Sequence, residues 1–598
     1  MTPTPGNKQP ATDASQPETA PTHSPPILEA SPIKESPVEN FRPLRVVVIG
    51  AGFSGIYLNI RIPELLRNVD LVTYEREAGI GGTWWLNRYP GCGCDIPAHS
   101  YVYSFEPNPN WSKFYASATE IRGYLEAVVD KYSAARRIKL KHEVCGLHWD
   151  AQRLKWRINV KDLDTGETFI DEADVVVGAR GGLSKYNWPE VNGLWDFRGK
   201  VVHSAAWDEN YDYSNKRIGV IGVGSSAIQI IPNLQKLPGT HLTCFIRSQT
   251  WIATPFGESA AAKLNIKDTE HTPEQRRHFV ENKDEYHAFR KTIESEGNAM
   301  YPVTLAGSAM SIGAQKYFKE LMQTRLAKKP ELANFLIPSF PPGCRRLTPG
   351  PGFLESLTED NVEVVTTHIR KVLPSGVELE DGSTIDLDAL VCATGFDFAA
   401  APEYPFVGLK GMDLKERYKD YPEAYFGLAV DGFPNFFMML GANTAVGAGS
   451  ATKILECQGD YIIKCIRKIQ KEDIGSMEIS PRAMRDWIRH INGYFKRTVF
   501  MEDCRSWYRK NDRIIGIWPG STCHAVETMR SPRWEDFNYT YSDHSPEYNR
   551  FGWLGNGTTD IEQTGGDISW YIEPENMDFP AAPFPEETEK WKKVSFSQ

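Results

Sequence analysis

The sequence lacks any long hydrophobic stretch. No apolar run in its 598 residues approaches the ~18–20 residues that a bilayer-spanning helix needs. The first residues also lack the short apolar core of a secretory signal, and they contain acidic residues but almost no arginine, unlike a mitochondrial transit peptide. These absences predict a protein without a membrane span that resides in the cytoplasm.

Positive charge is scarce as well. The 67 Lys and Arg residues are outnumbered by 77 Asp and Glu residues, which gives a formal net charge of -10. Binding a nucleic acid requires clustered Lys and Arg, so this balance argues against a nucleic-acid partner. At ~100–200 residues per domain, the chain is long enough for several globular domains with a cleft between them.

Cysteine is sparse. The ten cysteines are scattered between Cys92 and Cys523, unlike the dense framework of a secreted disulfide scaffold, so we expect reduced thiols. One close pair, Cys92 and Cys94, could be redox-active or bind a metal, but no other ligand stands at zinc-site spacing. Because isolated thiols are usually packing residues, we predict no metal site.

Residues 1–42 are rich in Pro, Ser, Thr and Glu and contain few residues that could build a core, which predicts a disordered tail. Order is predicted to begin at "LRVVVIGAGFSGIYL". This stretch combines a β-branched run, a glycine turn and helix-like spacing. It therefore predicts a strand–turn–helix unit.

The first glycine turn has the pattern G-x-G-x-x-G, at Gly50, Gly52 and Gly55. The first glycine permits a tight turn, the second lets backbone N–H groups approach a pyrophosphate, and the third lets the helix pack on the strand. The next predicted strand ends on Glu75, 25 residues after Gly50, where a carboxylate can accept hydrogen bonds from both ribose hydroxyls. This unit predicts a dinucleotide with a free ribose diol, which FAD provides.

A second strand–turn–helix unit, "RIGVIGVGSSAIQII", has the same pattern, with Gly222, Gly224 and, at the third position, Ala227. Its next strand ends on Arg247, again 25 residues after the first glycine. A guanidinium there can bind a 2′-phosphate through charge-assisted hydrogen bonds, whereas a carboxylate would repel it. This unit therefore predicts NADPH. The predicted contacts in this unit, besides the two glycines, are Ser225, Ser226, Arg247 and Ser248.

The two units predict an α/β fold with two Rossmann-like dinucleotide-binding domains, the NADP domain being inserted into the FAD domain. The charged, helix-forming stretch at about 257–335 predicts a helical insert in the NADP domain. The run "LDALVCATGFD" resembles the sequence that returns the chain to the FAD domain in the flavoprotein oxidoreductases. The predicted boundaries are 1–42 (tail), 43–195 (FAD domain, first part), 196–388 (NADP domain) and 389–598 (FAD domain, second part, and C-terminal extension).

Flavoproteins of this shape either pass electrons to a disulfide or activate oxygen. A disulfide reductase needs two redox cysteines close together beside the flavin, typically C-x-x-C or C-x4-C. No such pair follows either glycine turn. The sequence therefore favours oxygen activation.

Two further patterns resemble those of the flavin-dependent Baeyer–Villiger monooxygenases. The family fingerprint F-x-G-x-x-x-H-x-x-x-W-[P/D] is present just ahead of the second glycine turn, and "GGTWWLNRYPGCGCD" fits a second family pattern. The resemblance covers roughly residues 44–520. The fingerprint positions are Phe197, Gly199, His203, Trp207 and Asp208.

The resemblance implies roles for further residues. An active-site arginine is expected at Arg346 rather than its neighbour Arg345, with Asp95 holding it near the flavin. His203 and Trp207 are expected to govern domain orientation without touching the substrate. The remaining cofactor contacts that the resemblance implies are Thr83, Trp84, Asp95 and Tyr101 along the FAD, Val144 at the adenine, and Trp507 on a mobile loop over NADP.

The chemistry that the resemblance implies starts with reduction of FAD by NADPH and continues through a C4a-peroxyflavin formed with O2. That species attacks a ketone substrate and inserts one oxygen atom beside the carbonyl, giving an ester or lactone. A bulky polyketide or terpenoid ketone of secondary metabolism is the expected substrate. Two alternatives stay open, namely a nitrogen- or sulfur-oxidising flavin monooxygenase, which Trp207 and Asp208 disfavour, and a redox-sensing dinucleotide-binding regulator without turnover.

Overall fold

The computed structural model describes residues 31–573 except 265, 267–268, 399 and 544–547. The chain divides into a large unit, residues 39–544, and a small unit formed by its two ends. In the small unit, the Val38 N–H donates to the Thr558 carbonyl at 2.9 Å, and the Asn556 N–H donates to the Ser36 carbonyl at 2.9 Å. Its short helices are η8 (Gly552–Leu554), α15 (Asp560–Thr564) and η9 (Trp570–Ile572).

The first half of the large unit is built on a five-stranded parallel sheet, in the order β19-β7-β1-β2-β3. Its central strand alternates between two cores, because Val46 and Val48 face one while Val47 and Ile49 face the other. The strands are β1 (Leu44–Ile49), β2 (Val69–Tyr74), β3 (Ile138–Lys139), β7 (Val175–Gly178) and β19 (Phe436–Met438).

Helices cover one face of this sheet, and a four-stranded sheet of order β18-β4-β5-β6 covers the other. The helices are α1 (Phe53–Leu65), α3 (Ala118–Lys131), α12 (Ala451–Lys471) and α13 (Pro481–Phe495). The covering strands are β4 (His142–Asp150), β5 (Lys155–Asp162), β6 (Thr168–Ala173) and β18 (Phe406–Val407). The antiparallel pair β20 (Ile474–Ile479) and β23 (Phe537–Tyr541) adds to the helical side.

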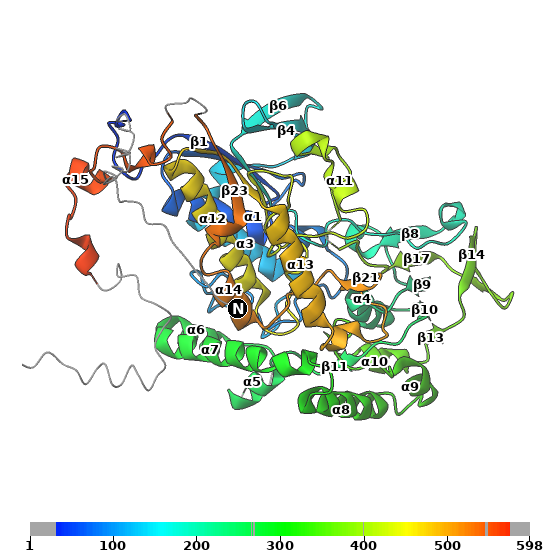
Figure 1. Cartoon of the computed structure of the whole chain (residues 1–598). Helices are drawn as coiled ribbons and strands as arrows, with labels where there is room; N and C mark the ends of the chain where they lie inside the picture. The colour runs from blue at the N-terminus through cyan, green and yellow to red at the C-terminus, as the bar shows by residue number, and fades with distance from the viewer. Residues whose placement is uncertain (1–30, 265, 267–268, 399, 544–547, 574–598) are drawn as a thin grey trace, which may run out of the picture. The chain divides into compact units, whose positions relative to one another are not determined.

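The second half repeats this plan. Figure 1 shows β8, β17, β9, β10 and β13 side by side in one parallel sheet. The strands are β8 (Lys200–His203), β9 (Arg217–Ile221), β10 (His241–Phe245), β13 (Val362–Val365) and β17 (Ala389–Cys392). Helices α4 (Ser225–Gln235) and α10 (Phe353–Leu357) pack on one face, and the antiparallel strands β14 (Ile369–Leu373), β15 (Gly376–Leu379) and β16 (Thr384–Asp386) cover the other.

One predicted boundary is wrong. We expected residues from 389 onward to belong to the FAD domain, but β17 pairs with β8 and β9 inside the second sheet. A wholly buried apolar strand reads the same in either sheet, so its sequence could not reveal its partners. The second half therefore extends at least to Cys392.

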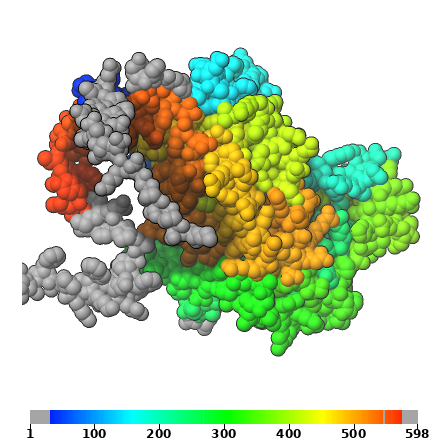
Figure 2. All heavy atoms as spheres, in the orientation of Figure 1, coloured from blue at the N-terminus to red at the C-terminus, as the bar shows by residue number. Residues whose placement is uncertain are grey.

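The predicted helical insert is present and contacts both halves. Helices α5 and α7 pack around Phe114 of the first half, whereas Phe318 and Met322 of α8 join the core of the second half. The helices of the insert are α5 (Glu258–Lys263), α6 (Pro273–Glu281), α7 (Lys283–Ala299), α8 (Ala309–Arg325) and α9 (Glu331–Leu336). The Ala306 N–H donates to the Arg497 carbonyl at 3.1 Å, and Figure 2 shows these green and orange segments side by side.

The prediction of a disordered tail is wrong for its last residues. Arg42 Nη2 donates to the carbonyls of Ile469 and Ile474 at 2.8 and 2.6 Å, and Asn40 Nδ2 donates to the Lys471 carbonyl at 3.1 Å. The carbonyls of Ile469 and Lys471 lie in the last turn of α12, where carbonyls lack partners within the helix, and Ile474 begins β20. Residues 1–30 lie outside the described part of the chain.

The expectation of reduced thiols is also wrong for two cysteines. Cys344 and Cys504 form a disulfide across 160 residues of sequence, whereas the other eight cysteines are free. Among the described residues, no cluster of three or more His, Cys, Asp or Glu side chains could hold a metal ion. Within the same residues, no helix combines the length and the apolar character needed to cross a membrane.

Candidate active site and cofactor-binding sites

The first glycine turn connects β1 to α1 and is shaped by close backbone contacts. Gly50 has a φ of +107°, and a Cβ there would lie 2.7 Å from the Ala179 carbonyl oxygen. A Cβ on Gly55 would lie 1.9 Å from the Gly50 carbonyl oxygen. At Gly52, in contrast, the nearest atom to a Cβ would be Gly82 Cα, at 3.5 Å. The protein itself does not require glycine at 52, which fits a position that a pyrophosphate approaches.

Glu75 lies directly at this turn. Its carboxylate is 8% exposed and accepts hydrogen bonds from the backbone N–H groups of Ala51 at 2.7 Å and Glu77 at 2.9 Å. Burial raises the pKa of Glu75, and the two hydrogen bonds oppose that rise. The His142 N–H donates to the Glu75 carbonyl at 2.9 Å, which places the buried Val144 of β4 two residues from this contact.

The residues expected along the flavin gather near the same turn. Thr83 and Trp84 open the short helix α2 (Thr83–Leu86). The Trp84 ring meets Tyr101 edge-on at 5.6 Å, and Tyr101 meets Phe53, the first residue of α1, at 5.1 Å. Burial raises the pKa of Tyr101, so its hydroxyl stays protonated. This aromatic group forms an apolar wall beside the glycine turn.

The second glycine turn has the same construction. Gly222 has a φ of +121°, and a Cβ there would lie 2.5 Å from the Ala393 carbonyl oxygen. A Cβ on Gly224 would meet no atom within 4 Å, and the φ of Gly224 is -81°. Ser225 and Ser226 then begin α4, where the Ser225 hydroxyl lies 2.8 Å from Thr348 Oγ1. An open glycine at a helix N-terminus suits a bound phosphate.

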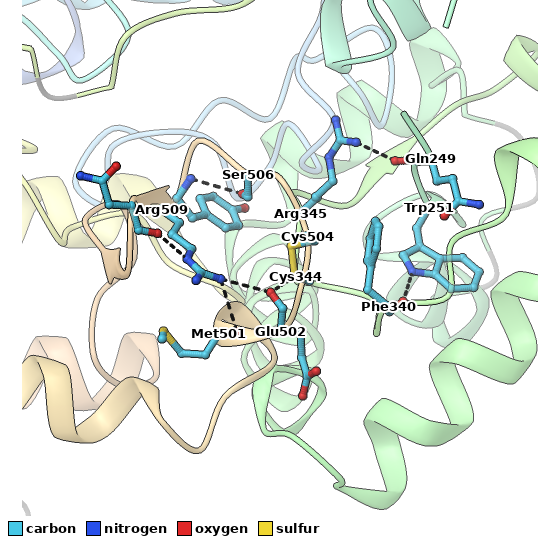
Figure 3. The surroundings of a disulfide bond; sticks show 12 residues. Gln249, Trp251, Phe340, Cys344, Arg345, Met501, Glu502, Cys504, Ser506 and Arg509 are labelled. Carbon is cyan, nitrogen blue, oxygen red and sulfur yellow. Dashed lines mark hydrogen bonds between the residues drawn. A yellow bond between two sulfur atoms is a disulfide. The ribbon is translucent and has the colours of Figure 1, made fainter. Parts of the chain in front are cut away.

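A cationic group lies at the end of β10. Arg247 is exposed, and the neighbouring Ser248 hydroxyl accepts a hydrogen bond from Arg345 Nη1 at 3.0 Å. The same Nη1 donates to the Gln249 carbonyl at 2.6 Å, as Figure 3 shows. Arg345 therefore points toward the predicted 2′-phosphate site, a role that sequence reasoning missed.

Arg346 points to the first half instead. Its Nη2 donates to both carboxylate oxygens of Asp95, at 2.7 and 2.8 Å. The Asp95 side chain is 15% exposed and that of Arg346 is 36% exposed. Asp95 raises the pKa of Arg346, and Tyr508 contributes in the same direction, so the guanidinium remains charged. The pair presents a fixed cation with part of its surface uncovered.

The fingerprint residues lie in the second half of the large unit. Phe197 is buried under β14 and β15, and a Cβ on Gly199 would lie 2.6 Å from its ring. Trp207 stacks on Tyr213 at 4.7 Å, and Asp208 forms an ion pair with Lys200 of β8. These four residues stabilise the second half. None of the contacts given for them involves Arg346 or Asp95.

His203 is placed where the chain crosses between the halves. Residues 185–187 pair with residues 395–397, since the Asn187 N–H donates to the Gly395 carbonyl at 3.0 Å and the Asp397 N–H to the Lys185 carbonyl at 2.9 Å. The fully buried His203 ring stacks on Tyr186 at 4.4 Å and meets Phe396 edge-on at 6.3 Å. Burial lowers the pKa of His203 to about 4, so the imidazole is neutral at physiological pH.

Trp507 lies in the segment that follows Cys504. Its ring contacts Phe398 at 4.8 Å and Tyr508 at 4.4 Å. Tyr508, which sequence reasoning did not single out, is buried, and the charge of the neighbouring Arg346 opposes the rise that burial causes in the pKa of its hydroxyl. The segment is thus adjacent to the Arg346–Asp95 pair through Tyr508.

Comparisons with known proteins agree with this geometry. Residues 48–118 match the NAD(P)-binding Rossmann-like domain family. The FAD-binding monooxygenase tazF of Aspergillus terreus is 37% identical over 541 residues, which cover 88% of this chain and 94% of that protein. A Baeyer–Villiger monooxygenase of Pseudomonas aeruginosa is 32% identical over 487 residues, covering 80% and 88%. The chain belongs to the Baeyer–Villiger monooxygenase family.

Solved structures of this family share the fold. A steroid monooxygenase bound to NADP superposes with a TM-score of 0.69 at 28% identity, covering 84% of this chain and all of that one. Cyclohexanone monooxygenase from Rhodococcus sp. Phi1, bound to NADP+, gives 0.71 at 26% identity, with 84% of this chain and all of that one covered. The predicted family and the α/β fold with two dinucleotide-binding domains are confirmed, and FAD and NADP are the cofactors that the names of these relatives give.

Proposed function

We propose that the protein oxidises a bulky ketone of secondary metabolism, a polyketide or terpenoid, to an ester or lactone. The Arg346–Asp95 pair carries this proposal, because it holds a charged guanidinium in place while leaving part of it accessible. The curated relatives include monooxygenases of Aspergillus terreus and Pseudomonas aeruginosa, and the structural neighbours include steroid and cyclohexanone monooxygenases. The name of the cyclohexanone monooxygenase supports a cyclic ketone as the substrate class.

The residues present fit both cofactors. The first turn has Gly52, where a Cβ would make only ordinary contact, and the buried carboxylate of Glu75. The second turn has open space at Gly224 and the cations Arg247 and Arg345 nearby. The FAD contacts we propose are Gly50, Gly52, Gly55, Glu75, Thr83, Trp84, Asp95, Tyr101 and Val144. The NADP contacts we propose are Gly222, Gly224, Ser225, Ser226, Arg247, Ser248, Arg345 and Trp507.

The two cofactors supply the redox chemistry, which is hydride donation and activation of O2. Arg346 contributes a fixed positive charge where negative charge develops on oxygen during attack on the carbonyl. Asp95 orients that guanidinium, and Tyr508 contacts it from the opposite segment. For the reaction, the hydrogen-bonded geometry of this pair is more important than its contribution to the stability of the fold.

The test is a product analysis with the purified flavin-loaded enzyme. NADPH consumption and product mass across a panel of cyclic and aryl ketones should show an ester or lactone one oxygen atom heavier than the ketone. Replacing Arg346 by Ala should lower the rate of ester formation by about 10²–10³-fold while FAD stays bound. Arg482→Ala, at an arginine 88% exposed, is the matched control. An N-oxide or sulfoxide formed from an added amine or thioether, with no ester or lactone from any ketone, would contradict the proposal.

A further inference from the structure

The disulfide joins two segments that both contact the proposed active site. Cys344 and Cys504 have Cα atoms 6.2 Å apart, and all ten cysteines lie in the described part of the chain, where the other eight are free thiols. Cys344 directly precedes Arg345 and Arg346, and Cys504 precedes Arg505 and Trp507. Figure 3 shows the bond beside Arg345 and Glu502. The bond therefore fixes the segment of Trp507 to the segment of the two active-site arginines.

The tethered segments bring two positive charges together. Arg345 donates its hydrogen bonds to neutral oxygens, those of Ser248 and Gln249. Burial lowers the pKa of Arg345, and the nearby Arg505 lowers it further. Two guanidiniums repel each other unless an anion lies between them. The disulfide keeps Arg505 close to Arg345 before the anion binds. Binding therefore loses less conformational entropy of these two side chains.

The anion that this arrangement suits is a phosphate. Arg345 reaches the hydroxyl of Ser248, which follows Arg247 at the end of β10, where the 2′-phosphate of NADP is proposed to lie. Guanidinium groups bind phosphate oxygens through charge-assisted hydrogen bonds. Arg505 is exposed, so it can approach a ligand from the solvent side.

A reductant can reach one sulfur of the pair. Cys344 is fully buried, but Cys504 is partly exposed and lies between the exposed residues Asp503 and Arg505. Thiol–disulfide exchange requires access for the attacking thiolate, and it proceeds through a mixed disulfide. Attack is therefore directed at Cys504, with Cys344 as the leaving group.

We propose that Cys344–Cys504 is a reversible redox site that sets the affinity for the phosphate of NADP, an inference that rests on the proposed cofactor site. A dithiol reductant attacks Cys504 Sγ through one thiolate and expels the Cys344 thiolate. Its second thiolate then attacks the reductant sulfur of the mixed disulfide and releases Cys504. Two electrons and two protons pass from the dithiol to the cysteine pair, and the reductant leaves as a disulfide.

The experiment compares the oxidised holoenzyme with the same preparation reduced by dithiothreitol under native conditions and then desalted. Alkylation and mass analysis should count eight thiols before reduction and ten after it. Titration of bound-flavin absorbance should show the Kd for NADP+ rising by about tenfold on reduction, since two arginine side chains lose their preset position. NAD+, which lacks the 2′-phosphate, should bind with unchanged Kd, and the FAD content should stay constant.

The double variant Cys344→Ser, Cys504→Ser should bind NADP+ like the reduced enzyme and should not respond to dithiothreitol. Cys523→Ser, which removes an exposed free thiol, should respond like the natural protein. The inference is overturned if ten thiols are present before reduction, if the bond resists the native dithiol, or if the Kd for NADP+ stays the same or changes together with that for NAD+. Absence of NADP+ binding in both redox states would instead contradict the proposed function.

Discussion

At the scale of single residues, two adjacent arginines face opposite halves of the molecule. Arg345 reaches Ser248 and Gln249, whereas Arg346 reaches Asp95. The two arginines are adjacent in the chain, yet their side chains contact different halves, so one short segment serves two sites. The sequence showed a basic pair beside the active-site loop, but the partners of each arginine depend on residues about 100 and 250 positions away.

This division predicts separate effects for the two arginines. Replacing Arg345 by Ala should raise the Kd for NADP+ by about tenfold, because one charge-assisted contact is lost, and should leave the Kd for NAD+ unchanged. Binding titrations with both dinucleotides measure this directly. Arg346→Ala should bind both as the natural protein does, so an equal loss of NADP+ affinity in both variants would contradict the division.

The glycines of the second turn predict a second contrast. Gly224→Ala should leave the melting temperature unchanged, because its φ is -81° and a Cβ meets no protein atom within 4 Å. It should nevertheless weaken NADP+ binding by at least tenfold, since the methyl occupies the space next to the proposed pyrophosphate.

Gly222→Ala is the matched control. It should lower stability by more than about 1 kcal/mol, because φ is +121° and the methyl would clash with the Ala393 carbonyl. Thermal unfolding and NADP+ titration of both variants provide the comparison. A Gly224 variant that binds NADP+ normally would show that the turn does not hold the pyrophosphate.

At the scale of elements, the sequence predicted the two strand–turn–helix units well because their signals are local. The β-branched run Val46 to Ile49, the glycines and the following helix all lie within a short window. The features that were missed depend on partners distant in sequence. The strand Ala389–Cys392 joined the second sheet, and Cys344 found Cys504 across 160 residues. Neither pairing leaves a signal in the local sequence.

The paired crossing segments predict a role for His203. Because its ring stacks on Tyr186 and meets Phe396, one from each crossing segment, it supports the joint between the halves. His203→Ala should slow NADPH-dependent ester formation by about tenfold or more, since misplacing groups remote from the chemistry costs rate. FAD content should remain that of the natural protein.

The readout is the ratio of ester formed to NADPH consumed, which should fall together with the rate. His203→Phe keeps an aromatic ring in the stack and should recover part of this ratio. Unchanged kinetics in the Ala variant would contradict a role in domain orientation.

At the scale of the whole large unit, two joints contain buried neutral histidines. His203 lies at the crossing segments, and His99 of the first half lies against His271 of the insert, with their Nε2 atoms 3.0 Å apart. The Tyr286 hydroxyl lies 3.0 Å from His99 Nδ1, and Arg290 Nε donates to the His99 carbonyl. Burial lowers the pKa of all three histidines, to about 4 for His203.

These shifts fix the direction of the pH dependence. Between about pH 6.5, the ordinary pKa of histidine, and pH 4, the unfolded chain binds protons that the folded chain excludes. The contribution of these histidines to the free energy of unfolding is therefore fully present above pH 6.5, and it decreases as the pH falls through this window. For His203 alone the loss amounts to at most about 3.5 kcal/mol, at about 1.4 kcal/mol per pKa unit.

Acidification should accordingly weaken the joints between the halves. We expect the melting temperature of the natural protein to fall steeply from pH 6.5 to pH 4.5, and His203→Asn or His271→Asn to show a shallower slope whatever their absolute stability. His241→Asn, at an exposed histidine, should keep the natural slope. Arg276 adds to the lowering of the His271 pKa that burial causes, and Glu120 opposes it. Parallel curves for all four proteins would show that acid acts elsewhere in the molecule.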